Sequence, residues 1–306
     1  MAKKIALIIL NWKQPQLTID TVDSILKTNT NGFTYEILIV DNGSPDDSVA
    51  QFKRIYGKNK SITILETGDN LGYAGGNNYG LRFALKSNFD YFLIANNDIL
   101  VAPDFLQKLF DSSQQYPKAI LTPKIYFAPG FEFHKDRYSK KEIGKVIWAV
   151  GSQIDWNNIY GSNIGIDEVD HGQYDIHHPK IDFISGCCFL ISREIVNKIG
   201  IFDERYYLYM EDSDLTTRAL KSGFELRLVP KSIIWHCNSG SSKPGSALQD
   251  YFITRNRLIF GYRYASFRTK FALFRESLKF IVSGSTWRKQ GVIDFYLSRF
   301  GKGSWK

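Results

Sequence analysis

The first third of the chain alternates continuous apolar runs with segments whose apolar residues recur at helical spacing. The continuous runs are typical of strands covered on both faces, and they are Ile5–Leu10, Tyr35–Val40, Ile62–Leu65 and Tyr91–Ala95. Helices are expected at 15–26, at about 46–56 and, after a glycine-rich turn, near 79–85. This alternation with short connections predicts an α/β fold, in which helices flank a mostly parallel sheet on both faces.

The middle of the chain is less regular. Strands are expected within Ala119–Tyr126, Val146–Ile154 and Asp182–Ser192. Long polar segments at 129–142 and 157–179 are rich in turn formers and predict loops. Loops of this length in a compact domain are usually functional or mobile.

The last third predicts mainly helices. A helix is expected from Glu211 to about Gly223, followed by two short extended segments. Three more helices are expected after a Ser/Gly/Pro loop, and they are Ala247–Tyr264, Phe267–Val282 and Val292–Phe300. We therefore expect one large domain over residues 1–245 and a helical region over 246–306.

Charged residues are unevenly distributed, with the excess of Lys and Arg concentrated at the C-terminus. The 306 residues carry a formal net charge of +8, with 43% apolar and 23% charged residues, which excludes disordered and disulfide-scaffold classes. From Tyr251 to Lys306 there are 12 Lys and Arg residues against only Glu276 and Asp294. Such a segment either contacts nucleic acid, an anionic membrane or an acidic partner, or is a solvated basic helical tail.

Cysteine usage and the N-terminus bear on location. Cys187, Cys188 and Cys237 are odd in number and two are adjacent, which leaves no disulfide framework and favours a reducing cytoplasm. The run Ile5–Leu10 follows two lysines but is too short for a signal peptide. No uninterrupted apolar stretch approaches the roughly 18 residues of a membrane span, so we expect any membrane contact to be peripheral.

Polar residues follow three of the predicted strands directly. Asn11, Asp41 and Asp98 lie where the strands end, and parallel α/β sheets bind ligands beyond the carboxyl ends of their strands. Asp41 can accept hydrogen bonds from a base or a ribose hydroxyl, or it simply caps the next helix. Asn96-Asn97-Asp98 can complete the shell of a Mg²⁺ or Mn²⁺ ion on a diphosphate, or it forms an Asx turn.

Further candidates lie in the second half. Glu211, Asp212 and Asp214 open a predicted helix, and three acids in four residues are more than a cap requires. An ionised carboxylate there can act as a general base towards an alcohol. His236 ends a short apolar segment and is either a structural residue or a metal ligand. Gly186 interrupts an apolar run, which indicates a close approach that tolerates no side chain.

Together these residues resemble a family 2 glycosyltransferase with a GT-A fold, especially its bacterial rhamnosyltransferase-type members. The resemblance runs from Ile5 to about Ser242 through ordered motifs, which are Ile9-Leu10-Asn11-Trp12, Val40-Asp41-Asn42-Gly43-Ser44, Asn70-Leu71-Gly72-Tyr73-Ala74-Gly75-Gly76-Asn77-Asn78, Asn96-Asn97-Asp98, Phe202-Asp203-Glu204-Arg205, Glu211-Asp212-Ser213-Asp214-Leu215 and His236 with Ser239-Gly240-Ser241-Ser242. It implies a nucleotide-binding half over 1–118 and an acceptor-binding half over 119–245.

The resemblance also implies roles for single residues. Asp212 would be the base that deprotonates the acceptor hydroxyl in an inverting displacement. A divalent cation, Mn²⁺ or Mg²⁺, would be held by Asp98 and His236. The nucleotide would be bound by Asn11, Asp41, Asn70, Gly75, Asn78 and Asn97. The acceptor side would be lined by Gly186, Glu211 and Asp214.

One departure from the family pattern affects the metal. Asn96 stands where many members have the first Asp of the metal signature, and an amide offers a neutral oxygen in place of an anionic one. The Asn-Asn-Asp form resembles the rhamnosyltransferase-like branch and favours dTDP-rhamnose as donor, with a UDP-sugar as the alternative. We expect a cell-surface polysaccharide or lipid-linked glycan as acceptor.

We expect a cytoplasmic enzyme that contacts the inner face of the membrane through its basic C-terminal region, with no nucleic-acid partner. The alternative function is a noncatalytic nucleotide-sugar or glycan-binding protein of the same fold.

Overall fold

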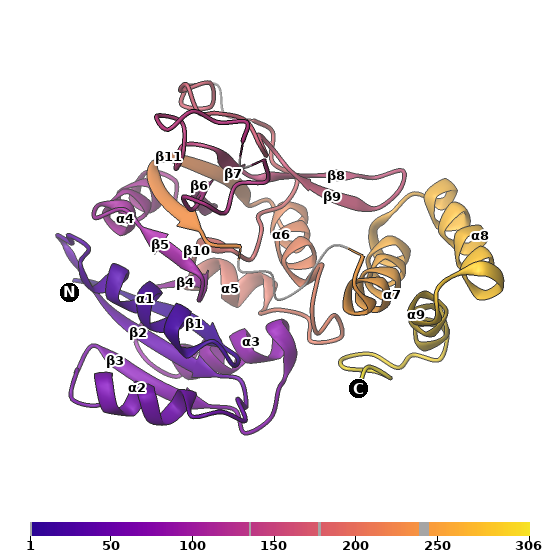
Figure 1. Cartoon of the computed structure of the whole chain (residues 1–306), viewed down its shortest axis with the longest axis horizontal. Coiled ribbons are helices and arrows are strands. Elements are labelled where there is room, and N and C mark those ends of the chain that lie inside the picture. Colours follow the sequence, from indigo (N-terminus) through magenta and orange to yellow (C-terminus); the bar gives the residue numbers. More distant parts are fainter. Residues whose placement is uncertain (1, 135, 177–178, 239–244) are drawn as a thin grey trace.

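A computed structural model describes residues 2–134, 136–176, 179–238 and 245–306 (Figure 1). It consists of a central sheet covered by helices on both faces, with a group of C-terminal helices at one end of the molecule. The central strands are β1 (Lys3–Asn11), β2 (Phe33–Asp41), β3 (Ile62–Glu66), β4 (Tyr91–Asn96), β5 (Ile99–Val101), β6 (Ala119–Phe127), β7 (Ile147–Ala149), β10 (Cys188–Ser192) and β11 (Glu225–His236). The α/β prediction is confirmed.

The helices follow the strands in the expected alternation over the first half. They are α1 (Pro15–Leu26), α2 (Ser48–Tyr56), α3 (Gly72–Leu85), α4 (Phe105–Gln115), α5 (Arg193–Ile199), α6 (Glu211–Lys221), α7 (Ala247–Tyr264), α8 (Phe267–Ser283) and α9 (Thr286–Tyr296). A separate hairpin is formed by β8 (Ser152–Asp155) and β9 (Tyr160–Asn163). Helices α4 and α5 are absent from the prediction, although α5 begins after a side-chain cap, in which Ser192 accepts from the backbone N–H of Ile195.

The strand order is β3-β2-β1-β4-β10-β6-β11-β5, with β7 beside β6. Strands β1 to β4 pair in parallel, as do β6 and β11, whereas β10 runs antiparallel to both β4 and β6, and β5 runs antiparallel to β11. The sheet is therefore mostly parallel with three reversed strands, β5, β7 and β10, since β7 also runs antiparallel to β6. These reversals bring the start of β10 and the end of β11 to the edge where β1, β2 and β4 end.

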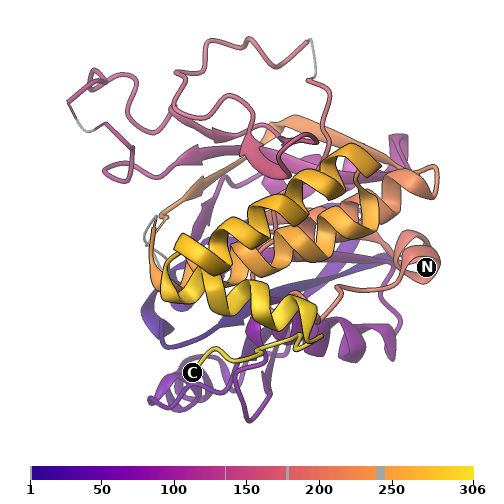
Figure 2. The ribbon, with the colours of Figure 1, turned by 90° about the vertical axis from the view of Figure 1, so that its right-hand side faces the viewer.

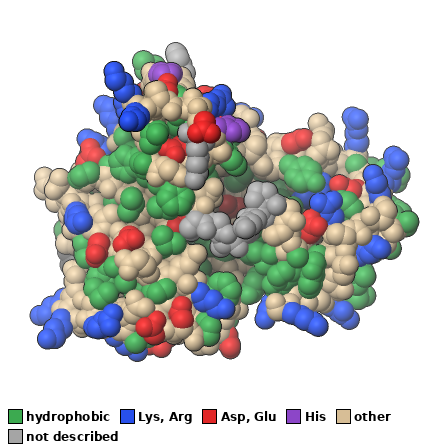
Figure 3. Space-filling view, in the orientation of Figure 1, with side chains coloured by type: hydrophobic (Ala, Val, Ile, Leu, Met, Phe, Trp, Pro, Cys, Tyr) green, Lys and Arg blue, Asp and Glu red, His purple; other side chains and the backbone are tan. Residues whose placement is uncertain are grey.

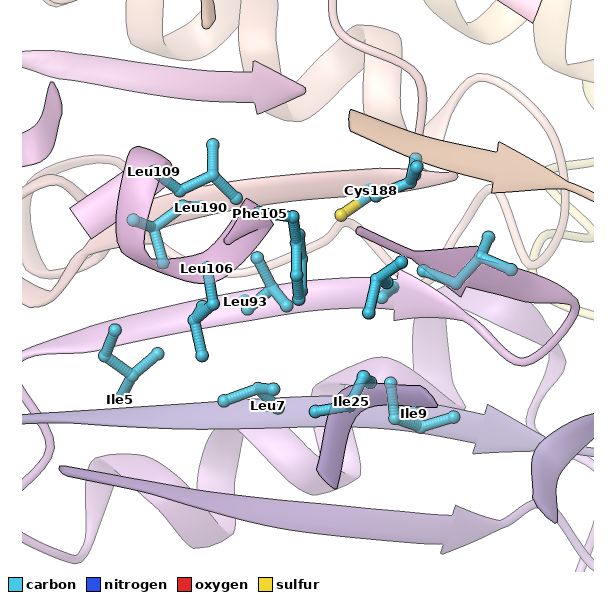
Figure 4. Packing of buried hydrophobic residues seen from close by; sticks show 14 of the residues in the cluster. Ile5, Leu7, Ile9, Ile25, Leu93, Phe105, Leu106, Leu109, Cys188 and Leu190 are labelled. Carbon is cyan, nitrogen blue, oxygen red and sulfur yellow. The ribbon is translucent and has the colours of Figure 1, made fainter. Parts of the chain in front are cut away.

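The buried strands explain the continuous apolar runs. Ile5, Leu7 and Ile9 of β1 pack into one core cluster with α1 and α4 (Figure 4), while Ala6 and Ile8 pack into another cluster on the opposite face. All five side chains are fully buried. Because successive side chains of a strand point to opposite faces, a strand with helices on both sides must be apolar at every position.

The glycine-rich segment was predicted as a turn, and that prediction is wrong. Helix α3 already begins at Gly72, so the segment forms its first turns. A Cβ on Gly76 would lie 2.5 Å from Leu10, and one on Gly80 would lie 2.8 Å from Ile8. The glycines let the helix approach β1 closely, and this packing outweighs the low helix propensity of glycine.

Other predicted elements have different bounds in the structure. Val146–Ile154 is two short strands, β7 and β8, separated at Gly151 with a φ of +98°. Only the last five residues of the run 182–192 form a strand, and the final helix spans Thr286–Tyr296 instead of Val292–Phe300. The two extended segments before His236 are one strand, β11, with a register shift between Val229 and Ile233.

The three cysteines are free, and Cys187 and Cys188 are buried. Within the described ranges, the helices include none that combines the length and the apolar character needed to cross a membrane.

Candidate active site

The carboxyl ends of β2, β1 and β4 carry a connected hydrogen-bond network. Asn11 Nδ2 donates to Asp41 Oδ2 over 2.8 Å, and Asn11 Oδ1 accepts from Thr18 Oγ1, also over 2.8 Å. Asn97 Nδ2 in turn donates to Thr18 Oγ1 over 2.9 Å. Strand pairing places Asn11 directly beside Asp41. Asn11, Asp41 and Asn97 therefore lie together at one edge of the sheet; for Asn11 and Asp41 this edge was predicted from their places after the strands.

Asp41 is almost fully buried, with 2% of its surface exposed. Its Oδ1 accepts from the backbone N–H of Ser44 over 2.9 Å while its Oδ2 accepts from Asn11. A carboxylate has about four acceptor sites, so this one keeps acceptor capacity after both contacts. The arrangement holds the carboxylate in a fixed orientation.

The remaining nucleotide candidates have structural partners. Asn70 Oδ1 accepts from Gly72 N–H over 2.9 Å and from the hydroxyl of Tyr207 over 3.1 Å, which anchors the start of α3. Asn78 is buried and exchanges hydrogen bonds with the backbone of Phe202, so it joins α3 to the segment before α6. Gly75 is a buried helical glycine whose Cβ would meet Leu71 at 2.7 Å.

A pocket of about 280 Å³ lies beside these strand ends, between β4, β11 and the start of α6. In Figure 3 the surface is hollowed near the centre of the face shown. The lining of the 280 Å³ pocket includes five of the predicted site residues, namely Asp98, Gly186, Glu211, Asp212 and His236. Asn96, the residue that departs from the family's metal signature, also lines it.

The Asp212 carboxylate is held in this pocket by two backbone hydrogen bonds. Its Oδ2 accepts from the backbone N–H of Gly186 over 2.9 Å, and its Oδ1 accepts from the N–H of Ser213 over 2.6 Å. Burial raises the pKa of Asp212 above its usual value, and these hydrogen bonds oppose that rise. A carboxylate that is partly desolvated and held by two backbone donors suits a general base.

The close approach predicted at Gly186 is made by the side chain of Tyr73. A Cβ at this position would lie 2.7 Å from the hydroxyl oxygen of Tyr73, and that hydroxyl donates to the Gly186 carbonyl over 2.6 Å. Only a residue without a side chain leaves room for the Tyr73 ring. The same peptide segment donates to Asp212, so Tyr73 of α3 helps to place the donor of the candidate base.

Glu211 is buried beside Asp212, and its Oε2 has no hydrogen-bond partner within the described residues. Burial, and next the charge of Asp212, raise the pKa of Glu211 well above its usual value. The two neighbouring acids therefore have different environments: Asp212 is held by backbone donors, whereas Glu211 favours the protonated form. Such a difference between adjacent carboxyl groups is common at catalytic sites.

Asp98 and His236 also line the pocket and lie against each other. His236 Nε2 lies 3.1 Å from Asp98 Oδ1, and both side chains are largely buried. The pairing of β11 with β5 places His236 opposite Ile99, next to Asp98 in the chain. His236 Nδ1 is buried and has no partner in the described part of the chain, while the Trp148 ring packs against the imidazole at 4.7 Å.

These two residues fit a divalent cation that completes its shell with other ligands. Neighbouring ligands of an octahedral ion lie about 3 Å apart, from metal–oxygen distances of about 2.1 Å. The 3.1 Å between His236 Nε2 and Asp98 Oδ1 is compatible with this spacing and equally with a direct ion pair. Over the described ranges, no group of three His, Cys, Asp or Glu side chains is placed to hold an ion. A diphosphate and water would have to supply the remaining ligands.

Asp214 does not line the pocket, although it was grouped with the acceptor-side residues. Its carboxylate is fully buried and pairs with Arg218 Nε at 2.8 Å and Arg263 Nη1 at 2.9 Å. The hydroxyl of Tyr264 donates to it over 2.8 Å. Asp214 thus ties α6 to α7, which is the reason for the third acid that a helix cap alone did not explain.

The chain matches the family model described as glycosyl transferase family 2 over residues 6–200. This match covers more than half of the chain. The protein belongs to glycosyl transferase family 2.

Curated relatives of this family-2 chain include two proteins named as transferases. It is 26% identical over 215 residues to an N-acetylglucosaminyl-diphospho-decaprenol L-rhamnosyltransferase of Mycobacterium tuberculosis, with 67% of each chain covered. It is 22% identical over 273 residues to the low-salt glycan biosynthesis hexosyltransferase Agl10 of Haloferax volcanii, covering 89% of this chain and 75% of that one. The predicted resemblance to rhamnosyltransferase-like members is confirmed.

Among solved structures, the chain resembles GalNAc-T7, determined with UDP, GalNAc and Mn²⁺. The TM-score is 0.59 at 14% sequence identity, and the alignment covers 96% of this chain and 58% of that one. The likeness confirms the GT-A fold for this glycosyltransferase and concerns little more than half of the compared chain.

Asp212 and His236 lie beyond the residues that the family model matches. The fold nevertheless brings them to the pocket formed with Asp98, because α6 and β11 both reach the edge where β4 ends. Sequence reasoning assigned no role to Tyr73, Trp148 or Tyr209, which also line this pocket. The predicted close approach at Gly186 indicated that another residue packs there, but the sequence did not identify that residue as Tyr73.

The segment before α6 is held by the C-terminal part of the glycosyltransferase. Tyr207, Tyr209 and Met210 all have positive φ values, 64°, 70° and 70°, a conformation that costs non-glycine residues free energy. The buried Asn256 of α7 donates from Nδ2 to the carbonyl oxygens of this segment, at 2.9 Å for Tyr206, 2.8 Å for Leu208 and 2.8 Å for Tyr209. The C-terminal helices therefore help to build the site.

Proposed function

We propose that this family 2 glycosyltransferase transfers a sugar, with inversion, from a nucleoside-diphosphate donor to an acceptor hydroxyl. The observation that carries the proposal is the pocket in which Asp212, held by Gly186, shares a lining with the Asp98–His236 pair. A base and a pair suited to a cation are the two groups that such a displacement needs.

In the proposed reaction, the Asp212 carboxylate takes the proton of the acceptor hydroxyl. The acceptor oxygen forms a bond to the anomeric carbon while the bond from that carbon to the diphosphate oxygen breaks, and the diphosphate leaves with the electron pair. The hydrogen bonds from Gly186 and Ser213 hold Asp212 in place during the proton transfer. A divalent cation on Asp98 and His236 would neutralise charge on the departing diphosphate.

The donor site is proposed at the ends of β1, β2 and β4. Asp41 would accept hydrogen bonds from the base or ribose, with Asn11 and Asn97 keeping its surroundings fixed. Asn70, Gly75 and Asn78 would act indirectly, because their contacts shape the start of α3 next to this edge. The name of the rhamnosyltransferase relative supports rhamnose as the transferred sugar. We propose dTDP-rhamnose as the donor, and a UDP-sugar is the alternative.

The acceptor is proposed to be a lipid-linked glycan or a growing surface polysaccharide. The diphospho-decaprenol in the relative's name supports an acceptor of the lipid-linked class. Gly186 and Glu211 line the pocket beside Asp212 and would contact the acceptor. We also propose a cytoplasmic location with peripheral contact at the inner face of the membrane.

A thermal-shift panel tests the donor site. UDP, dTDP, GDP and CDP are each added with Mn²⁺, Mg²⁺ or EDTA to the wild type, Asp98→Ala and His236→Ala. A nucleotide at about one hundred times its dissociation constant adds roughly 2.7 kcal/mol of stability, which shifts the melting temperature by several degrees.

We expect dTDP or UDP to give a cation-dependent shift that both variants lose. Asp111→Ala, which removes an exposed acid on α4, is the matched control and should keep the shift. A protein that none of the four nucleotides stabilises would contradict the proposed donor site.

A further inference from the structure

The positive charge of the C-terminal region is distributed unevenly once the chain is folded. Arg255 and Arg257 are buried, and Arg257 pairs with Glu276 at 3.0 Å. Arg263 pairs with Asp214, and Arg288 with Asp250 at 2.8 Å. These four cations are thus committed to internal contacts, so the sequence count overstates the charge that this region offers to a partner.

Helix α8 carries an unusual second apolar face. One face, with Leu273 and Ser277, is buried against the neighbouring helices, as expected. On the other face, six large apolar side chains are exposed, with exposed fractions of 86, 55, 40, 51, 40 and 79% for Phe267, Phe271, Phe274, Leu278, Ile281 and Val282. We call these six residues the outer face of α8.

The spacing of these residues makes the outer face continuous. Steps of four and three residues repeat along the helix, and at about 100° per residue the six side chains fall within an arc of roughly 100°. Figure 1 places α8 at the far end of the molecule from β1 to β3, and Figure 2 shows it with α7 and α9 on one face. An exposed apolar stripe of this kind on a soluble domain usually marks an interaction site.

Cations border the outer face on both sides. On the helical projection, Arg268, Arg275 and Lys279 follow one edge of the arc, and Lys270 follows the other. None of these four forms an ion pair within the described part of the chain. Figure 3 shows Lys and Arg side chains gathered at this end of the molecule.

We propose that the outer face of α8 docks on an anionic lipid bilayer, with its apolar side chains in the headgroup–acyl boundary and its flanking cations at the lipid phosphates. An apolar arc with basic borders is the pattern of helices that lie in a membrane interface. The inference deepens the proposed membrane contact and rests on it, but it assigns that contact to a small set of residues.

Charge complementarity favours the bilayer over a second copy of this chain. A two-fold symmetric interface would place the same cationic borders of both copies close together, and like charges brought together at an interface are unfavourable. An anionic surface instead meets every cation with an opposite charge. Docking through α8 would also hold the enzyme beside a membrane that contains a lipid-linked acceptor.

The test measures sedimentation of the full chain with vesicles, without donor or acceptor, at physiological salt. The vesicles are phosphatidylcholine alone or phosphatidylcholine with about a third phosphatidylglycerol. The wild type should bind the anionic vesicles and bind the neutral ones at least tenfold more weakly. Phe267→Ser/Phe271→Ser should lower the anionic partition coefficient at least tenfold, and Arg268→Gln/Lys279→Gln about fivefold for each cation removed.

The matched control is Phe133→Ser/Ile176→Ser, which removes two apolar side chains of similar exposure, 57% and 81%, from other segments. It should bind vesicles as the wild type does. Equal vesicle binding by the α8 double variant and the wild type would overturn the proposal, as would a wild-type dimer that the α8 variant converts to a monomer. The nucleotide thermal shift is measured on the same samples. If the wild type shows the thermal shift but does not bind vesicles, only this inference is refuted. If it binds vesicles but shows no thermal shift, only the proposed donor site is refuted.

Discussion

The backbone N–H of Gly186 donates a hydrogen bond to Oδ2 of Asp212 over 2.9 Å. This contact joins the segment entering β10 to the first turn of α6, two parts of the chain that are 26 residues apart. It exists because β10 runs antiparallel to β4 and therefore starts at the edge where β4 ends. The candidate base thus takes its orientation from sheet topology.

Replacing Asp212 by Asn should remove the proposed base while keeping its shape. General-base catalysis contributes roughly 10² to 10⁴-fold, so turnover should fall by that range, with donor-nucleotide thermal shifts unchanged. Asp111→Asn, an exposed substitution on α4, should keep wild-type turnover. Transfer by Asp212→Asn at a rate near that of the wild type would show that another group takes the proton.

Gly186→Ala should disturb the site through Tyr73. The new Cβ would lie 2.7 Å from the Tyr73 hydroxyl, so the ring or the peptide must move and the donor to Asp212 moves with it. We expect kcat/KM to fall at least tenfold. Tyr73→Phe in the same chain should restore part of the loss, because it removes the closest contact.

The two single variants and the double variant form a cycle that separates this contact from other effects. If the double variant showed the simple product of the two single losses, the two residues would act independently and the steric account would be wrong.

Asn256→Ala should weaken both the fold and the site. The part-buried carbonyl oxygens of Leu208 and Tyr209 lose their Asn256 donor, whereas the Tyr206 carbonyl still accepts from Arg255 and from the backbone N–H of Leu208. A buried unsatisfied group costs about 1–3 kcal/mol. We expect the free energy of unfolding to fall by about 2–4 kcal/mol in chemical denaturation. Turnover should fall more than donor binding, because the loop of positive φ values leads into Asp212.

The control for this variant is Asn197→Ala, an exposed asparagine on α5, which should change the free energy of unfolding by no more than about 0.5 kcal/mol. An Asn256→Ala protein with wild-type stability would mean that other donors satisfy the two carbonyls.

Glu211 should give the protein a specific dependence on pH. Its pKa in the folded state is raised well above the usual value by burial and by Asp212. The folded state therefore binds the proton more tightly than the unfolded state does, so this contribution to stability is full below the unfolded pKa and is lost as pH rises through the folded pKa. Gln at position 211 cannot ionise, so the free energy of unfolding of Glu211→Gln, relative to that of the wild type, should be higher at pH 8 than at pH 4.5.

Urea unfolding of both proteins at the two pH values measures this effect. The difference in free energy of unfolding between Glu211→Gln and the wild type should become more favourable to the variant at the higher pH. A difference that stays constant between pH 4.5 and pH 8 would mean that Glu211 keeps its ordinary pKa in the folded state.

Much of the first half of the fold was predictable from the sequence. The runs around Ile5–Leu10 and Tyr91–Ala95 are apolar at every position, and only a strand covered on both faces requires that pattern. Asn11, Asp41 and Asp98 could be assigned to one sheet edge because parallel strands end on the same side. These are local rules, in which neighbours in sequence decide the outcome.

Other features depended on contacts between distant segments. The helix from Gly72 was predicted as a turn because glycine is a poor helix former, whereas close packing on Leu10 and Ile8 favours it in the folded chain. The sequence predicted a basic helical region over 246–306 but not its contacts, and in the structure Arg255 and Asn256 are fully buried beneath the segment before α6.

The sequence alone determined the fold class, the common sheet edge of Asn11, Asp41 and Asp98, and the family, because periodicity and ordered motifs are properties of the chain itself. Tertiary structure decided which of the acids face the pocket. Asp212 and Asp214 are two positions apart in the same helix, but about 200° of rotation separates them, so one meets Gly186 and the other meets Arg218 and Arg263. Which face of α6 borders the pocket depends on how distant strands and helices pack around it.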